Sequence, residues 1–529
     1  MKRFSFIVFL LLCSLFGNAQ FMQFSEGPTF PDPGNGFAKI LQMKNYSTLF
    51  IHVSFDKGIT VQAYEPKYKA KTETLIEPAY GVLQAGNVEG IFEVNGDAVV
   101  FVSNAGKTET DLYRLIINAE TGKLKEEQKI ASVKKVQMKK AVAQLPDVSV
   151  RKDPASDNYA VAMFRAFESD TSKRVEVVLY GNDHREINRG SYTAPQEKYK
   201  YLQYLDMAVI GADAKVSVLL YGYNVEASNE KIGDVVLANL DKDSKSISLN
   251  ELYVSNDLVI EKGITRFEPQ SKRLLFLTTA TVKSESNNPG AFLGIIDPHS
   301  KKLITNNAIS AGEKVQEKYA QLFGKNAVYS GVPQNLFLNN DESYTVIFEE
   351  MEFAKENDTT SRTLLRNTAV ATYNKEGEIV SSYLIPFDHY VSNVQVPAFY
   401  QSVRDISGQQ FLKDNPYKSS TYISDGHNSF ILFNDNEVNG QQLTGKLKRF
   451  KELTDADAFY CLLAGKEVAP KHQYVFGKPV TTATKIGLQH KLGLFTVYDY
   501  DKMNNIFVVL KQDKEDSQHP GVRLVWLQP

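Results

Sequence analysis

A recurring pair of strand-like runs joined by a short polar turn most constrains the fold of this chain. Each copy has an apolar or alternating run, a turn rich in Asn, Asp, Gly and Lys, and a second alternating run. Asn, Asp and Gly tolerate the positive φ of tight turns, so the pattern predicts antiparallel β-hairpins. The clearest copies are DLYRLIINAETGKL (111–124), RVEVVLYGNDHREI (174–187), DVVLANLDKDSKSI (234–247), AFLGIIDPHSKKL (291–303) and NTAVATYNKEGEIV (367–380).

Asp297 and His299 lie in one of these turns, where they resemble a metal-binding or acid–base pair. The histidine has no counterpart in most of the other turns, whereas the aspartate does. Pro298 also suits the second position of a turn. We therefore predict that Asp297 forms a turn and takes no part in a reaction. The equivalent positions are Asn118, Asn182, Asp241 and Asn374.

Two further strand candidates precede each hairpin, which gives units of four antiparallel strands. The turns recur about every 60 residues, somewhat longer than the roughly 40 to 50 usual in propeller families. Four-stranded repeats predict an all-β fold, a β-propeller with eight blades favoured and seven as the alternative. Only three strands remain at the C-terminus. We expect QFMQF (20–24) to supply the fourth and close the ring, which would remove the exposed sheet edges.

Two segments interrupt the strands with helical periodicity, so we predict short helical connections at 132–145 and 312–325. A third interruption, 386–420, is a long connection between two blades. Connections longer than about 15 residues are uncommon in compact domains and are often functional. We therefore treat residues 20–529 as a single propeller domain with an inter-blade insertion at 386–420.

The N-terminus predicts export. MKRFSFIVFLLLCSLFGNAQ (1–20) has two basic residues, a short apolar run and small residues before Gln20, as secretory signals do. We place the signal peptide at 1–19. No later run reaches the roughly 20 apolar residues of a transmembrane helix. Only Cys461 remains after cleavage, so no internal disulfide can form, which favours a bacterial periplasm or cell surface.

The charge of the chain argues against nucleic acid as a partner. The net charge is −2 over 529 residues, so there is no global basic field. A local basic cluster in the first helical segment is interpreted as a solvated face. We expect a monomer. The cluster consists of Lys134, Lys135, Lys139 and Lys140.

Sequence motifs for catalysis are missing. The chain has no G-x-S-x-G elbow, H-E-x-x-H, phosphate-binding loop or dinucleotide-binding glycine pattern, and its 8 histidines have no zinc-like spacing. Cys461 lies among apolar neighbours and is interpreted as a buried hydrophobe. A propeller can still assemble a site from distant residues, so enzymatic activity stays open, with a non-enzymatic role favoured.

The best metal candidate lies in NDNEVNGQQLTG (434–445). Asp435, Glu437 and Asn439 alternate before a glycine, as oxygen ligands do at the start of a calcium loop. The twelfth position is Lys446 where such a loop has a bidentate glutamate, so the match is half complete. The alternative is a polar loop between strands. We expect no cofactor except this calcium ion, if the loop binds one.

The 386–420 connection carries aromatic residues, of which His389, Tyr390, Phe399 and Tyr400 form our candidate binding surface. Aromatic side chains on a loop suit a protein or glycan partner. The alternative is that they pack on the blades beneath or plug the central channel.

Acidic residues on the expected inner strands could converge near the channel axis: Glu93, Asp147, Asp206, Glu261 and Asp425. A pair of carboxylates there would permit glycoside hydrolysis. The alternative is isolated acids at strand ends.

These observations favour an exported, non-enzymatic β-propeller that binds a protein, a glycan or an envelope component through its loops. One alternative is a carbohydrate-active hydrolase with carboxylates at the channel mouth. The other is a structural component of an envelope assembly. The sequence does not choose among them, because propellers carry many unrelated activities.

Overall fold

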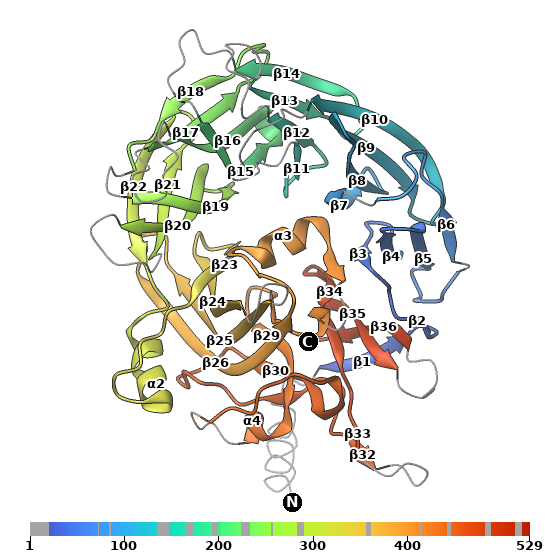
Figure 1. The fold of residues 1–529 in the computed structure, drawn as a ribbon, viewed down its shortest axis with the longest axis vertical. Helices are drawn as coiled ribbons and strands as arrows, with labels where there is room; N and C mark the ends of the chain where they lie inside the picture. Colours follow the sequence, from blue (N-terminus) through green and yellow to red (C-terminus); the bar gives the residue numbers. More distant parts are fainter. Residues whose placement is uncertain are drawn as a thin grey trace, which may run out of the picture.

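Eight antiparallel β-sheets of four strands each form a closed ring, a β-propeller, in a computed structural model of the chain (Figure 1). This confirms the predicted fold class and the favoured blade number. The structure describes residues 21–529 except 72, 84–85, 135–147, 165–173, 193–198, 200, 224–232, 255–257, 283–289, 356–360, 412–414, 442–445, 482–487 and 514–520.

Each blade runs from an innermost strand at the channel to an outermost strand at the rim. The first four blades are β3 (Gly36–Gln42), β4 (Thr48–Ser54), β5 (Gly58–Tyr64), β6 (Thr74–Ile76); β7 (Asn87–Val94), β8 (Asp97–Ala105), β9 (Glu109–Asn118), β10 (Leu124–Lys134); β11 (Val148–Lys152), β12 (Tyr159–Phe164), β13 (Val175–Tyr180), β14 (Glu186–Tyr192); and β15 (Tyr201–Ile210), β16 (Lys215–Tyr223), β17 (Gly233–Leu240), β18 (Ser248–Glu251).

The last four blades follow the same plan. They are β19 (Leu258–Glu268), β20 (Arg273–Val282), β21 (Gly290–Asp297), β22 (Lys302–Ile309); β23 (Val332–Leu338), β24 (Tyr344–Lys355), β25 (Ser361–Tyr373), β26 (Ile379–Ser392); β28 (Thr421–Ser424), β29 (Ser429–Asn436), β30 (Ala456–Leu462), β31 (Gln473–Tyr474); and β34 (Gly493–Asp501), β35 (Ile506–Asp513), β36 (Gly521–Gln528), β1 (Met22–Glu26). Two further strands, β32 (Val480–Thr481) and β33 (Leu488–Gln489), form a separate pair.

The N-terminal strand closes the ring. β1 pairs antiparallel with β36, so the outermost strand of the eighth blade comes from the opposite end of the chain. β2 (Phe30–Pro31) pairs with β36 as well. The expected closure by the first residues after the predicted leader is confirmed, and it covers a sheet edge that would otherwise be free to pair with another chain.

The core lies between neighbouring blades. One apolar cluster joins the first two blades through Ile51, Val61, Val100 and Leu115, and others join the following pairs. A middle strand packs on both faces, so every residue of β4 is buried. The middle strands therefore have continuous apolar runs, and they lack the alternation of apolar and polar residues that is typical of a strand with one exposed face.

The polar turns of the hairpins join the third and fourth strands of their blades. In the fifth blade, Asp297 Oδ1 accepts hydrogen bonds from the backbone N–H groups of His299 at 2.9 Å and Ser300 at 3.4 Å. In the second blade, Asn118 Oδ1 accepts from the N–H groups of Glu120 and Thr121. The prediction of a structural turn at Asp297 is confirmed.

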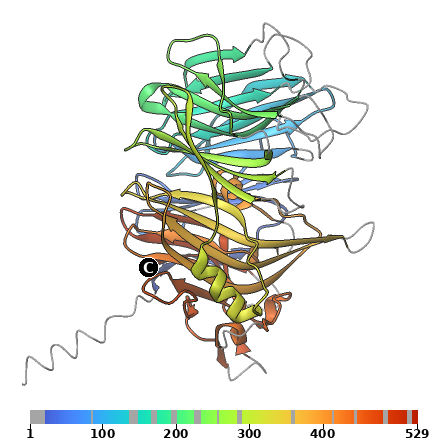
Figure 2. The same ribbon diagram turned by 90° about the vertical axis from the view of Figure 1, so that its left-hand side faces the viewer.

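The predicted helix at 312–325 is confirmed as α2 (Glu313–Phe323), which lies on the outside of the ring beside β26 (Figure 2). The predicted helix at 132–145 is wrong at its start, because β10 continues as a strand through Lys134. Its remainder lies outside the described residues, as do three of the four clustered lysines and the predicted signal peptide. Within the described part of the chain, no helix is long and apolar enough to cross a membrane.

The connection between the sixth and seventh blades enters the centre of the ring. β26 continues to Ser392, after which the chain forms α3 (Tyr400–Ser407) and the short strand β27 (Gln409–Phe411). β27 pairs antiparallel with the inner edge of β3 in the first blade. The insertion therefore crosses the channel before it returns to the seventh blade, with α3 at the centre of the ring (Figure 1).

Candidate functional site

The helix α3 is fixed inside the channel by its buried polar face. Arg404 is 6% exposed, and its guanidinium donates to the carbonyl oxygen of Ser420 at 3.3 Å and to Thr421 Oγ1 at 3.1 Å. The helix follows Phe399, which has φ 63°, and ends at Gly408, which has φ 87°. A Cβ atom on Gly408 would lie 2.7 Å from the carbonyl oxygen of Ala38, so the change of direction into β27 requires glycine.

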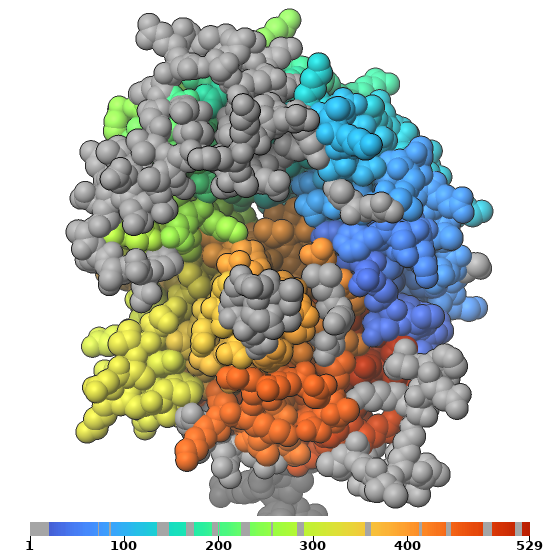
Figure 3. All heavy atoms as spheres, in the orientation of Figure 1, coloured from blue at the N-terminus to red at the C-terminus, as the bar shows by residue number. Residues whose placement is uncertain are grey.

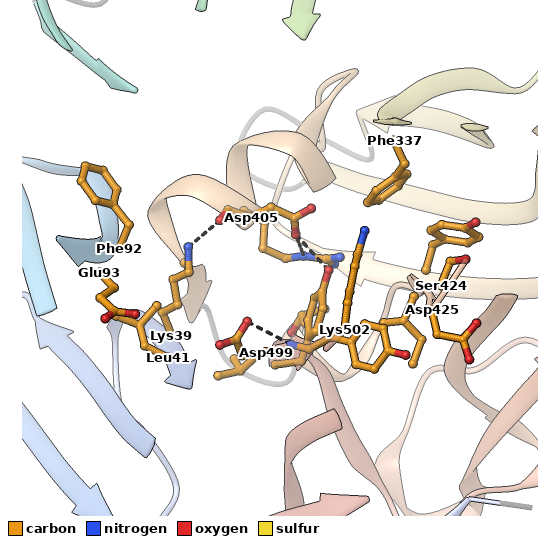
Figure 4. A pocket seen from close by; sticks show the side chains of 18 of the residues that line it. Lys39, Leu41, Phe92, Glu93, Phe337, Asp405, Ser424, Asp425, Asp499 and Lys502 are labelled. Atoms are coloured by element: carbon orange, nitrogen blue, oxygen red, sulfur yellow. Dashed lines mark hydrogen bonds and ion pairs between the residues drawn. The ribbon is translucent and has the colours of Figure 1, made fainter. Parts of the chain in front are cut away.

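A cavity of about 610 Å³ lies beside α3, which we call the acidic cavity. Its walls come from the innermost strands of five blades and from the helix (Figure 4). Figure 3 shows a narrow opening at the centre of the ring, between the orange atoms there and the green blades. Its carboxylates are Glu93, Asp405, Asp425 and Asp499, and its aromatic rings are Phe92, Phe337, Tyr422, Tyr498 and Tyr500.

Asp405 brings a carboxylate from α3 to the cavity wall. Its Oδ2 atom accepts a hydrogen bond from Asn335 Nδ2 at 2.8 Å, and its Oδ1 atom accepts one from the Tyr498 hydroxyl at 3.4 Å. Lys39, on β3, donates to the backbone carbonyl oxygens of Asp405 and Ile406. The C-terminal end of the helix is thereby tied to the first blade, and the carboxylate is held in place by two blades.

Asp499 lies on β34, on another side of the same cavity (Figure 4). Its carboxylate accepts hydrogen bonds from the backbone N–H groups of Gln42 at 2.6 Å and Tyr500 at 2.9 Å. Burial raises the pKa of Asp499 to about 6, against these hydrogen bonds and the charge of Lys39, which lower it. This carboxyl group therefore changes its protonation state near pH 6.

The other two acids also have structural contacts. Glu93 accepts from the backbone N–H of Lys44 with both oxygens, and burial raises the pKa of its carboxyl group. Asp425 Oδ1 accepts from the N–H groups of His427 and Asn428 and so shapes the turn after β28. All four acids of the cavity therefore also hold other groups of the protein in place.

The candidate aromatic surface of the 386–420 connection does not form as expected. His389 is fully buried, stacked on Phe387 with ring centroids 4.4 Å apart, and Phe399 is 3% exposed. Tyr390 is half-buried beneath the ammonium group of Lys451. Tyr400 donates to Glu349 Oε2 at 2.8 Å. The correction has a simple reason: β26 extends through His389 and Tyr390, so their ring positions are set by blade packing.

The candidate calcium ligands are arranged as a strand followed by a short helix. Asp435 lies in β29, fully buried, and accepts from Asn439 Nδ2 at 2.8 Å. Glu437 begins α4 (Glu437–Gln441) and accepts from the Tyr474 hydroxyl at 2.8 Å. Asp435 and Asn439 therefore meet, but Glu437 has a different partner. Among the described residues no three His, Cys, Asp or Glu side chains are grouped for a metal ion, and calcium binding stays a prediction.

The acidic residues that were expected near the channel axis lie in different surroundings. Glu93 and Asp425 line the acidic cavity, whereas Asp206 is 1% exposed and paired with arginines. Glu261 is exposed and accepts from Thr281. Asp147 lies outside the described residues.

Sequence reasoning missed Asp405, Asp499 and Lys39. Asp499 stands near the end of its innermost strand, as Glu93 does, so an alignment of innermost strands gave a signal for it. Asp405 gave no such signal, because nothing local to residues 400–407 indicates that this helix enters the channel.

No family model and no curated protein matches the chain. Solved structures that resemble it include an apocarotenoid oxygenase from Synechocystis (10% identity, 68% of this chain and 74% of that one, TM-score 0.33). A protein of unknown function from Dyadobacter fermentans matches at 8% identity over 97% of this chain and 100% of its own, with a TM-score of 0.32. The polysaccharide lyase Uly1 matches at 9% identity over 86% and 92%, with a TM-score of 0.35. Likenesses this distant carry no activity over to this chain.

Proposed function

We propose that this protein is an exported, non-enzymatic propeller that binds a glycan in the acidic cavity. The observation that carries the proposal is the wall of that cavity, to which five different elements contribute carboxylates and aromatic rings. Ionised carboxylates only accept hydrogen bonds, so they suit a ligand rich in hydroxyl donors. Aromatic faces supply apolar contact for the C–H surface of sugar rings.

The proposal of export rests on the signal peptide predicted at 1–19, and the locations it predicts are the periplasm and the cell surface. Glycans are exposed to an exported protein in both places. A peptide with hydroxyl and amide donors is the competing ligand, and the binding experiment below distinguishes the two.

Isothermal titration calorimetry with a panel of neutral oligosaccharides and matched peptides tests the proposal. We expect at least one oligosaccharide to bind, and Asp405→Asn to weaken it roughly tenfold, since a hydrogen bond to a charged group is worth about 1.5 to 3 kcal/mol. Asp183→Asn is the control, because Asp183 is a surface aspartate with 56% of its side chain exposed. Binding of peptides alone, or equal affinities of wild type and Asp405→Asn, would contradict the proposal.

A carbohydrate-active hydrolase is the second candidate, favoured by one observation. Asp499 has its pKa raised to about 6 in a cavity that also holds Asp405, and glycosidases use one protonated and one ionised carboxyl group. Incubation with the oligosaccharides that bind, followed by a reducing-end assay between pH 5 and 7, decides between the two. Product release by wild type that is lost in both Asp405→Asn and Asp499→Asn would favour the enzyme.

A further inference from the structure

A second cavity, of about 310 Å³, adjoins the acidic cavity in the channel, and we call it the basic cavity. The two cavities share wall residues, including Lys39, Phe92, Phe337 and Asp405, so they are neighbouring chambers of one channel. The basic cavity is lined by the innermost strands of the first to sixth blades and by α3. Its charged residues are Lys39, Arg151, Lys152, Arg266 and Asp405.

Two arginines in this cavity share one buried carboxylate. Asp206 accepts from Arg151 Nε at 2.8 Å, and its other oxygen lies 3.5 Å from Arg266 Nη1. That second oxygen also accepts the backbone N–H of Thr265 at 2.8 Å. A single negative charge thus stands between two positive ones, which leaves an excess of positive charge beside the cavity.

The guanidinium of Arg266 is also anchored to the channel helix. Its Nη2 atom donates to Ser402 Oγ at 2.7 Å and to Asn335 Oδ1 at 3.2 Å, both neutral acceptors. Burial lowers the pKa of Arg266; Asp206 opposes that shift, and the charge of Arg151 adds to it. The positive charges of the two arginines are therefore close together and only partly compensated.

Lys152 adds a third cation at the cavity wall, 3.2 Å from Asp157. Asp157 also pairs with Lys44 at 2.8 Å, so this carboxylate is shared between two lysines. In the described walls, the cations of the basic cavity outnumber its one lining carboxylate, Asp405. The acidic cavity, by contrast, has four carboxylates and three cations in its described wall, Lys39, Arg404 and Lys502, so positive charge prevails in the basic cavity alone of the two.

We infer that the basic cavity binds an anionic group, a carboxylate or a sulfate ester, on the glycan whose hydroxyl-rich part occupies the acidic cavity. This inference rests on the proposed function and narrows the ligand to an acidic glycan. Guanidinium groups offer planar, paired donors that match carboxylate and sulfate oxygens. A partly buried site strengthens such an interaction relative to bulk water.

The first experiment needs no glycan. Thermal unfolding is measured in sodium sulfate and in sodium chloride at equal ionic strength for wild type, Arg151→Gln and Arg189→Gln. Arg189 lies on β14 of the same blade as Arg151 and pairs with Glu176, so it controls for loss of a paired arginine outside the channel. We expect sulfate to raise the melting temperature of wild type and Arg189→Gln more than that of Arg151→Gln. Equal shifts in all three proteins would overturn the anion site.

The second experiment compares oligosaccharides of equal length that are neutral, uronic-acid-containing or sulfated. We expect wild type to bind one acidic set about tenfold more tightly than the neutral set. In Arg151→Gln, the ratio of these two affinities should fall towards one, while the affinity for the neutral set stays the same. Preference for uronate identifies a carboxylate site, and preference for the sulfated set identifies a sulfate site.

Different results would refute the anion site and the binding of a glycan. Equal affinities for neutral and acidic sets in wild type would overturn the anion site and leave glycan binding intact. Binding of no oligosaccharide would overturn the proposed function, while the sulfate experiment still decides the anion site. If Arg151→Gln does not fold, Lys152→Gln replaces it, because 22% of the Lys152 side chain is exposed.

Discussion

Replacement of Glu349 by glutamine should remove a pH-dependent part of the stability of this protein. Glu349 lies on β24 with no exposed surface, and its Oε2 atom accepts from the Tyr400 hydroxyl of the channel helix. Burial raises the pKa of its carboxyl group from 4.5 to about 7; the Tyr400 hydrogen bond and Arg404 lower it, but by less. The folded chain therefore keeps a proton that the unfolded chain releases between these two values.

The sign and size of the effect follow from this shift. Below pH 4.5 the carboxyl group is protonated in both states, and its contribution does not vary. As the pH rises towards 7, the unfolded state gains stability by ionising, so folding becomes less favourable by about 3 kcal/mol in total. Glutamine keeps the shape and an acceptor for Tyr400 but cannot ionise. Its amide N–H groups also need acceptors, a cost that does not depend on pH.

Differential scanning calorimetry of wild type and Glu349→Gln at pH 5, 6, 7 and 8 measures this contribution. The melting temperature of the variant, relative to wild type, should rise by about 2 °C between pH 5 and pH 8 for a chain of this length. Glu352→Gln is the matched control, on the same strand with 53% of its side chain exposed. A difference between Glu349→Gln and wild type that is constant over this range, or that grows towards acidic pH, would refute the reasoning.

Three further outcomes are expected. Deletion of residues 20–26 should leave β36 unpaired at 525–528, and size-exclusion chromatography should show more aggregate than for the intact mature chain. Gly408→Ala should lower the melting temperature, because φ is 87° and the new Cβ would approach the carbonyl oxygen of Ala38. Gly465→Ala is the control, because Gly465 has a similar φ but open space around its Cβ position. A loss of melting temperature as large in Gly465→Ala would contradict the steric argument. Cys461 is fully buried and burial raises the pKa of its thiol, so a thiol reagent should modify it only after denaturation, and fast reaction with the native protein would contradict its placement.

Local features made the fold predictable. Strand-like runs, turn residues at Asn118 and Asp297, and the regular spacing of four-stranded units are properties of neighbouring residues, and the blades keep them. The closing strand was predictable by elimination, because a ring with one incomplete blade needs a strand from the other terminus. Helical periodicity worked at 312–325, where the segment lies on the outside, and was wrong for 132–134, where blade pairing continues the strand.

The site depended on contacts between distant residues. The aromatic residues of the 386–420 connection looked available for binding, but burial depends on what other segments cover them, and β26 packs His389 in the core. The spacing of Asp435, Glu437 and Asn439 fitted half of a calcium loop, yet the strand β29 includes Asp435 and directs its carboxylate to Asn439.

The sequence by itself therefore determined the repeated hairpins, the eight-bladed ring and its closure, because turn chemistry and strand periodicity act over a few residues. Only the tertiary structure decided that α3 enters the channel and that Asp405, from the insertion, lies in one cavity with Asp499 from the last blade. It also decided that Arg151 and Arg266 share Asp206 in the neighbouring cavity. These groups are far apart along the chain, and only ring closure and the pairing of β27 with β3 bring them together.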